Sequence, residues 1–442
     1  MRQTLLPDLV VDAHGTSSGV GITVERGRLT AVGPATGGER LPGRALAPGF
    51  ANDHSHAFQR GLRGAVERIE PSQSRDDFWT WRERMYALAG ELAPDSIREV
   101  SRRCYGEMLS AGYASVTEFH YVHHRPDGTP YRDPNALAKA VALAAEDTGI
   151  RLLLLPVAYA RGGLPRFQDS SVQEFLQRVD DLRGWSEGRP LVEVGVAAHS
   201  VRAVSRGWLQ EIGSYARRDD LPLHIHADEQ PREVEECLAE HGLRPVELLA
   251  EAGFLGPHTT IIHATHASGR EMDLLSQHGA SVCACPTTEG NLGDGFLPAG
   301  GILERDIRLS IGSDSHVRID PFEELREIET NARRLSGRRN VLIAESETAP
   351  TPWLLQAGWG HDGPKAGVPA DLIEIDLTHP ALADVKARNL PSALVFGAGS
   401  AVVAGTWVEG RKVWARGDAH SRVSTRGNPA ENDDSSPCWG LL

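Results

Sequence analysis

Two histidines separated by one residue, His54 and His56, stand where an apolar run ends in the segment APGFANDHSHAF. On an extended segment, the side chains of residues i and i+2 point to the same side of the chain. Both imidazoles can then reach one point in space, which suits a metal ion. A chance pair of surface histidines is the simpler explanation for this motif alone, so the rest of the chain has to decide.

Other histidines and carboxylates follow further apolar, strand-like runs in the same way. They are Glu118, His120 and Tyr121; His199; His224 and His226 with Glu229 beyond them; His263; and Asp314. If these runs are parallel strands of one barrel, their carboxyl ends meet at a single mouth, where catalytic residues of such barrels lie. The repetition at equivalent positions therefore predicts a metal site.

Eight apolar runs in the middle of the chain are the elements that must position these residues. They cover 44–52, 114–122, 151–160, 191–199, 221–228, 259–266, 280–287 and 308–315. Amphipathic helical stretches such as DPNALAKAVALAAEDTG and REVEECLAEHG lie between most of them. The alternation predicts an α/β fold, a (β/α)8 TIM-like barrel.

Both ends of the chain are rich in short strand-like segments, unlike the middle. We expect residues 1–45 and 366–420 to pair into one small β-sandwich domain, beside a barrel formed by residues 46–365. A hairpin is expected to turn at Glu409-Gly410. The polar tail 421–442 is expected to be poorly ordered.

Composition excludes several classes of partner. The net charge of −14 argues against nucleic acid, because phosphate binding needs a basic face. No apolar run approaches the roughly 20 residues that cross a bilayer, and the N-terminus lacks a signal-peptide pattern. Five scattered cysteines are typical of reduced thiols in a cytoplasmic protein, and Cys283 and Cys285 are interpreted as core residues.

Three neutral imidazoles and one carboxylate suit Zn²⁺, with Fe²⁺ as the alternative. We choose His54, His56, His226 and Asp314 as ligands. Alternation alone also allows His224 to face inward; Glu229 favours His226, because His-x-x-Glu places a ligand beside a proton-transfer group. A second metal in such a barrel commonly needs a bridging carboxylated lysine, and no lysine stands on a predicted barrel strand. One metal per chain is therefore expected.

These residues resemble the amidohydrolase superfamily, in its deaminase-like branch with one metal. NDHSHAFQRGLRG, DFWTWRERMY, TEFHYVHHRPDGTPY, HIHADEQPREVEEC and CPTTEGNLGDG together are similar to the family of N-formimino-L-glutamate iminohydrolases (formimidoylglutamate deiminases) of histidine degradation. That family hydrolyses the formimino group to give N-formyl-L-glutamate and ammonia. Asp53, directly before the histidine pair, departs from the apolar residue more usual there; it would either perturb the metal site or support a ligand.

The resemblance implies the same four metal ligands, with catalytic roles for Glu229 and His263. It implies substrate contacts from Gln59, Arg82, Tyr121, His199 and Arg202, and suggests a homodimer. In the corresponding chemistry Asp314 accepts a proton from the attacking water and Glu229 carries a proton to the leaving nitrogen. Arg82 and Arg202 suit the two carboxylates of a small-molecule substrate, N-formimino-L-glutamate.

Two other functions remain open at this point. A deaminase of a heterocycle, such as guanine or a triazine, would share the metal and Glu229, but would need an aromatic or apolar pocket instead of paired arginines. A metal-free scaffold would have lost ligands, and none of the proposed ligands is missing.

Overall fold

The computed structural model describes residues 2–69 and 76–418, and its centre is a nearly closed barrel of eight parallel strands. The predicted (β/α)8 barrel is therefore confirmed. A ninth short strand, β9 (Val192–Val194), pairs with β8 directly before the fourth barrel strand. The barrel strands, in the order in which they pair, are β6 (Phe50–Ser55), β7 (Tyr113–His120), β8 (Arg151–Ala158), β10 (Val196–Ser200), β11 (Leu223–Ala227), β12 (Thr259–His263), β13 (Ser281–Ala284) and β14 (Leu309–Ile311).

The barrel closes where the chain after β14 meets β6. The amide of His56 donates to the carbonyl of Asp314 (3.1 Å), and the amide of Asp314 donates to the carbonyl of His54 (3.0 Å). Gly312 permits this approach, because a Cβ there would lie 2.7 Å from the Cβ of His54. The same main-chain bonds that close the barrel thus bring three of the proposed ligands together.

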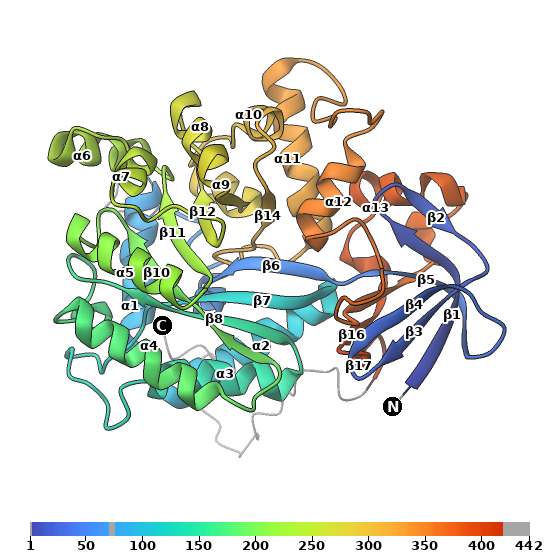
Figure 1. Ribbon diagram of the computed structural model, residues 1–442, viewed down its shortest axis with the longest axis horizontal. Coiled ribbons are helices and arrows are strands. Elements are labelled where there is room, and N and C mark those ends of the chain that lie inside the picture. Colours follow the sequence, from blue (N-terminus) through green and yellow to red (C-terminus); the bar gives the residue numbers. More distant parts are fainter. Residues whose placement is uncertain (1, 70–75, 419–442) are drawn as a thin grey trace.

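Helices cover the outside of the barrel (Figure 1). They are α1 (Phe78–Glu91), α2 (Pro94–Ala111), α3 (Ala136–Thr148), α4 (Val172–Ser186), α5 (Arg206–Arg218), α6 (Pro231–His241), α7 (Pro245–Glu251), α8 (Gly269–His278), α9 (Pro286–Leu292), α10 (Ala299–Glu304), α11 (Pro321–Ser336) and α12 (Thr351–Trp359). Because helices lie over the barrel strands, these strands are largely buried, and their sequences are mostly apolar before the polar residues at their carboxyl ends.

Helix α11 shows how the local sequence sets these elements. Asp320 caps its first turn by accepting from the amides of Phe322 and Glu323, and Pro321 follows at the first helical position. Phe322 and Leu325 are fully buried one turn apart, so one face packs on the barrel. Gly337, at φ 66°, ends the helix in the left-handed conformation that glycine favours.

A separate mixed sheet is built from strands of both chain ends, as predicted. In it β5 (Glu39–Pro48) lies between β15 (Leu372–Asp376) and β1 (Arg2–Asp12); β3 (Val20–Glu25) and β4 (Arg28–Pro34) continue one side, β16 (Val403–Val408) and β17 (Arg411–Ala415) the other, and β2 (Gly15–Ser17) pairs with β1. The helix α13 (Leu390–Gly397) precedes β16. The hairpin turn between β16 and β17 is confirmed: Glu409 and Gly410 both have positive φ.

The first predicted run, 44–52, is two strands rather than one. Its first half belongs to β5 of the mixed sheet, and its second half belongs to β6 of the barrel. The break falls at Gly49, where an added Cβ would lie 2.5 Å from the Cβ of Ala114. The Pro48-Gly49 pair, of a type that marks breaks in a sequence, stands at this change of sheet.

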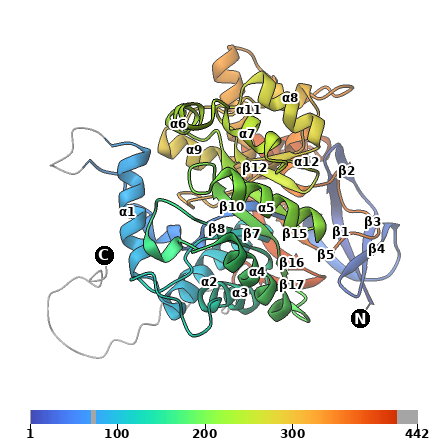
Figure 2. The same ribbon diagram turned by 60° about the vertical axis from the view of Figure 1, so that its left-hand side comes forward.

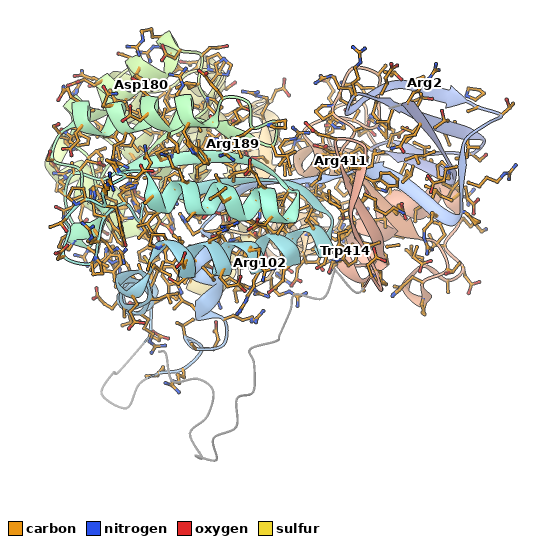
Figure 3. The ribbon with its side chains drawn as sticks, turned by 90° about the horizontal axis from the view of Figure 1, so that it is seen from below. Arg2, Arg102, Asp180, Arg189, Arg411 and Trp414 are labelled. Atoms are coloured by element: carbon orange, nitrogen blue, oxygen red, sulfur yellow. The ribbon has the colours of Figure 1, made fainter. Side chains whose placement is uncertain are left out.

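The mixed sheet lies on the side of the barrel opposite α1 (Figures 1 and 2). Seen from below, β17, which carries Arg411 and Trp414, faces the barrel beside α2, which carries Arg102 (Figure 3). An ion pair joins the two units, because Arg151 of β8 contacts Asp371 at 3.0 Å. The hydroxyl of Thr406 in β16 also donates to the carbonyl of Leu109 in α2 (2.6 Å).

The boundaries placed near residues 45, 365 and 420 stay predictions. The tail 421–442, expected to be poorly ordered, lies outside the described residues. Within the described part of the chain, none of the helices has the length and apolar character needed to span a bilayer.

Candidate metal centre and active site

Strand ends bring the four proposed ligands to one buried point at the mouth of the barrel. His54 and His56 come from the end of β6, His226 from β11 and Asp314 from the residues just after β14. The Nε2 atoms of His54 and His226 lie 3.0 Å apart, and Oδ1 of Asp314 lies 3.3 Å from Nε2 of His54 and 3.4 Å from Nε2 of His56. Ligand atoms of His54, His56 and Asp314 lie within 4.8 Å of one another, as do those of His54, His226 and His263.

Hydrogen bonds from Nδ1 orient two of the imidazoles so that Nε2 faces the cluster. His56 donates from Nδ1 to the carbonyl of Phe119, and His226 donates from Nδ1 to the carbonyl of His199, each at 2.9 Å. The Nε2 atoms are then left as acceptors toward the cluster, the arrangement usual for metal-binding histidines. Nδ1 of His54 has no hydrogen-bond partner within residues 2–69 and 76–418.

Electrostatics keep these imidazoles neutral. Burial, with the neighbouring histidines, lowers the pKa values of His54 and His226 well below the usual range for histidine. Burial and the nearby His54 lower the pKa of His56 to about 3. Neutral imidazole is the form that binds a metal ion, so the donor set fits Zn²⁺ chemically.

His263 and Glu229 lie beside this cluster and differ from it in charge. Nε2 of His263 is 3.5 Å from Oε1 of Glu229 and 3.9 Å from Oδ2 of Asp314, while its Nδ1 is 3.3 Å from Oε1 of Glu289. Burial opposes protonation of His263, but these three carboxylates together raise its pKa well above the usual range. Burial raises the pKa of Glu229 to about 7, against the opposing effect of His263 and Arg202. The pair is thus built to hold and pass a proton.

Left-handed backbone conformations gather at these strand ends. Asp228, His263, Ala264, Asp314 and His316 all have φ between 44° and 73° without being glycine. Such conformations are costly and persist where the surrounding structure enforces them, typically at functional sites.

A buried polar network lies between the two closing strands. The hydroxyl of Ser55, which stands between His54 and His56, donates to Glu118 (2.5 Å) and lies 3.0 Å from Nε2 of His316. Nδ1 of His316 lies 2.9 Å from the hydroxyl of Ser313, which accepts from Asn52 at 2.6 Å. The residues that flank the proposed ligands are therefore fixed from both strands.

Asp53 and His224 lie lower in the barrel, away from the proposed ligands. The carboxylate of Asp53 accepts from the hydroxyls of Thr117 (3.1 Å) and Ser310 (2.6 Å). His224 lines a cavity at the base of the barrel, together with Asp53 and Ser310. Of the two roles considered for Asp53, neither is supported by a contact with the metal cluster, and His226 rather than His224 enters that cluster.

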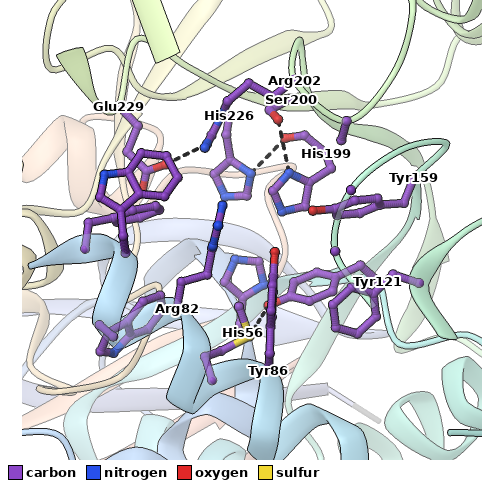
Figure 4. Close-up of a pocket in the computed structure, with 18 of the residues that line it drawn as sticks. His56, Arg82, Tyr86, Tyr121, Tyr159, His199, Ser200, Arg202, His226 and Glu229 are labelled. Carbon is purple, nitrogen blue, oxygen red and sulfur yellow. Dashed lines mark hydrogen bonds and ion pairs between the residues drawn. The ribbon is translucent and has the colours of Figure 1, made fainter. Parts of the chain in front are cut away.

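All five proposed substrate contacts line one cavity of about 250 Å³ at the mouth of the barrel. They are Gln59, Arg82, Tyr121, His199 and Arg202, and His56, His226, Glu229 and Asp314 line the same cavity. Gln59 donates to the hydroxyl of Tyr121 (2.9 Å). Figure 4 shows Arg82 reaching from α1 toward the histidines, with Arg202 and Glu229 beyond them joined by an ion pair of 3.7 Å.

Several residues of this site were missed from the sequence. Trp79 and Tyr86 of α1 and Tyr159 at the end of β8 add aromatic walls to the cavity (Figure 4 labels the tyrosines). Glu289 orients His263, and Glu233 lies behind Glu229. Tyr159 ends a predicted strand, and Glu289, Trp79 and Glu233 stand in the blocks CPTTEGNLGDG, DFWTWRERMY and HIHADEQPREVEEC, so each had a signal. Which residues of these blocks reach the cavity depends on packing.

A parallel barrel that buries histidines and an aspartate at the carboxyl ends of its strands defines the class of metal-dependent barrel hydrolases. The profile of the Amidohydrolase family matches residues 45–348 of this chain. The chain belongs to the amidohydrolase family and is a metal-dependent amidohydrolase.

Particular relatives narrow the comparison. A formimidoylglutamate deiminase of Pseudomonas aeruginosa is 38% identical over 418 residues, which cover 89% of this chain and 91% of that protein. A 5-methylthioadenosine/S-adenosylhomocysteine deaminase of Haloarcula marismortui is 27% identical over 406 residues, covering 89% and 87%. Among solved structures, an amidohydrolase from Brucella melitensis superposes with a TM-score of 0.85 at 35% identity, covering 94% of this chain and 96% of that one.

Proposed function

We propose that this protein hydrolyses N-formimino-L-glutamate to N-formyl-L-glutamate and ammonia. The observation that carries the proposal is a pair of arginines in the same cavity as the metal cluster. Arg82 and Arg202 each have a buried Nε atom without a hydrogen-bond partner in the part of the chain that the structure describes. Burying a guanidinium group without full hydrogen bonding is costly, and a substrate carboxylate would supply acceptors to each of these groups.

The similarity to the formimidoylglutamate deiminase of Pseudomonas aeruginosa supports the same substrate. N-formimino-L-glutamate has two carboxylates and one amidine-like carbon. The cavity is lined by two guanidinium groups and by His56, His226, Asp314 and Glu229. These two kinds of lining group match the two kinds of group in the substrate.

We propose one Zn²⁺ per chain, held by His54, His56, His226 and Asp314, with Fe²⁺ as the alternative. When bound, such an ion lowers the pKa of a water molecule from about 15.7 to about 7. The barrel strands β6 to β14 contain no lysine that could bridge a second ion, and Lys139 lies in α3, paired with Asp133 at 2.7 Å.

The residues of the chain account for the proton transfers. A carboxylate oxygen of Asp314 accepts a proton from the attacking water, and Nε2 of His263 steadies the oxygen as its bond to carbon forms. Glu229 first accepts a hydrogen bond from the formimino nitrogen. It then takes up the two protons of the water in turn, by way of Asp314, and delivers them to this nitrogen, so that the carbon–nitrogen bond breaks and ammonia leaves. The carbonyl of N-formyl-L-glutamate remains.

Deamination of a heterocycle is the second candidate, because the cavity has aromatic walls formed by Trp79, Tyr86, Tyr121 and Tyr159. A neutral heterocycle would leave the Nε atoms of the two arginines without a hydrogen-bond acceptor among the described residues. Ammonia release from N-formimino-L-glutamate, compared with guanine and cytosine, separates the candidates. We expect turnover of N-formimino-L-glutamate only; turnover of a heterocycle in its place would overturn the proposal.

A further inference from the structure

Glu233 is a buried carboxylate that the proposed chemistry does not use. It lies in the first turn of α6 with a relative exposure of 0%. Its Oε2 accepts the amide of Glu229 at 3.1 Å, and its Oε1 has no hydrogen-bond partner in the described ranges. A fully buried carboxylate with one oxygen unpaired is costly, so it calls for an explanation.

The unpaired oxygen faces Arg202. Nε of Arg202 lies 3.9 Å from Oε1 of Glu233, while its Nη2 lies 3.7 Å from Oε2 of Glu229. Both distances exceed hydrogen-bonding range, so the guanidinium lies between two carboxylates without being committed to either. The ring of Trp79 flanks it, 5.6 Å from the guanidinium carbon.

Two nitrogen atoms of this guanidinium therefore have different surroundings. Nε faces Glu233, which is buried and held by the backbone of Glu229. Nη2 faces Glu229, which lines the open cavity together with Arg202 itself. A substrate carboxylate that enters the cavity meets Arg202 on the side of Glu229, because Glu233 does not line this cavity.

We propose that Glu233 is a positioning residue that anchors Nε of Arg202, while Nη2 exchanges Glu229 for a substrate carboxylate. This inference rests on the proposed function. In the free protein Arg202 draws Glu229 toward itself. Once a carboxylate occupies the guanidinium, Glu229 is released to serve the formimino nitrogen. Recognition of the remote carboxylate is thereby coupled to the proton carrier, so that remote binding energy also supports turnover.

Glu233→Gln tests the anchor, because glutamine keeps the size and an acceptor for the amide of Glu229 but removes the charge. We expect KM for N-formimino-L-glutamate to rise about 10- to 100-fold, the range for residues that act through another group. Binding of N-formyl-L-glutamate, followed by calorimetry, should weaken by a similar factor. Glu235→Gln, an exposed change of the same type on α6, should leave both unchanged.

The double variant Arg202→Met/Glu233→Gln distinguishes positioning from a structural role. If Glu233 acts through Arg202, the double variant loses no more than Arg202→Met alone. The two single variants should also share one pattern on N-formimino-4-aminobutyrate and N-formimino-2-aminobutyrate, each of which lacks one carboxylate. On one and the same truncated substrate, both single variants should have nearly the kcat/KM of the unchanged protein.

The outcomes separate the two levels of the argument. If the unchanged protein does not hydrolyse N-formimino-L-glutamate, the proposed function fails. If it does, but the losses add, or Glu233→Gln weakens all substrates equally, the anchoring role is overturned. If Glu233→Gln does not accumulate as folded protein, Glu233→Asp carries the same comparison under the same criteria, since it keeps the charge but withdraws it by one methylene.

Discussion

The mouth and the base of this barrel contain similar residues from the same strands, yet only the mouth is arranged for chemistry. The strand β6 supplies His54 to the mouth and Asp53 to the base, and β11 supplies His226 and His224 in the same way. At the base, the carboxylate of Asp53 is satisfied by two hydroxyls. At the mouth, Nε2 of His54 faces Nε2 of His226 at 3.0 Å.

The mouth and the base differ in the partners of their polar side-chain atoms. Two neutral imidazole nitrogens that face each other share at most one proton, and burial disfavours a second one. A cation between them and the nearby carboxylate of Asp314 satisfies all of these atoms. The mouth is therefore a site for an ion. At the base, two hydroxyls hold the carboxylate of Asp53, and Nδ1 of His224 has no hydrogen-bond partner among the described residues. Residue type alone does not separate the two.

The largest effect is expected from Asp314→Asn at the mouth. Removing the charged ligand should lower bound metal from about one equivalent per chain to near zero and abolish hydrolysis, because a neutral amide is a poor zinc ligand. Elemental analysis and ammonia release measure both. Ser310→Ala, in β14 at the base, is the matched control and should retain the metal. If Asp314→Asn stayed active and kept its metal, the proposed difference between the mouth and the base would be wrong.

Glu229→Gln should separate chemistry from metal binding within the mouth. We expect the metal and the fold to remain while kcat falls by about 10²- to 10⁴-fold, because a general acid–base group is lost. Steady-state kinetics with elemental analysis provide the check. A variant that keeps its kcat but loses its metal would make Glu229 a ligand instead.

Arg202→Met should reduce kcat/KM for N-formimino-L-glutamate by a factor equivalent to about 2–5 kcal/mol of activation free energy. This is the cost of leaving one buried charge unpaired. Part of this loss should appear in kcat if the remote contact orients the reacting carbon. For a truncated substrate without the corresponding carboxylate, the same substitution should reduce kcat/KM much less. Equal losses on both substrates would mean that Arg202 supports the fold or the metal site.

The smallest effect on activity is expected at the base, from Asp53→Asn. Metal content and kcat should stay close to those of the unchanged protein, while the free energy of unfolding falls by about 1–3 kcal/mol, because hydrogen bonds to the charge of half-buried Asp53 are weakened. Denaturant unfolding and kinetics measure the two quantities. Loss of the metal in this variant would show that the base and the mouth are not independent.

The sequence was sufficient to predict the barrel, because helices on its outside make most strands predominantly apolar runs. The change from β5 to β6 within the first run was not predicted, although Pro48-Gly49 marks it, because both sheets bury residues on either side of that pair. Nor could it predict the closure between Ser55 and Asp314, which depends on main-chain register between segments far apart in the chain.

The candidate site divides in the same way. Residues at strand ends, such as His226 and Asp314, could be predicted because the fold fixes where strand ends meet. Alternation left His224 and His226 equivalent, and only the packing places one at the base and the other at the mouth. Glu233 and Trp79 act across helix surfaces whose approach to the cavity depends on tertiary packing, which no local pattern encodes.

The claim that the mouth holds one catalytic ion is tested most directly by adding zinc to protein from which a chelator has removed the metal. Ammonia release from N-formimino-L-glutamate is the readout. If the mouth holds one catalytic ion, activity should rise linearly with added zinc and reach its plateau at about one equivalent per chain. Full activity in the chelated protein, or a plateau only at two equivalents, would contradict the assignment of a single metal centre to His54, His56, His226 and Asp314.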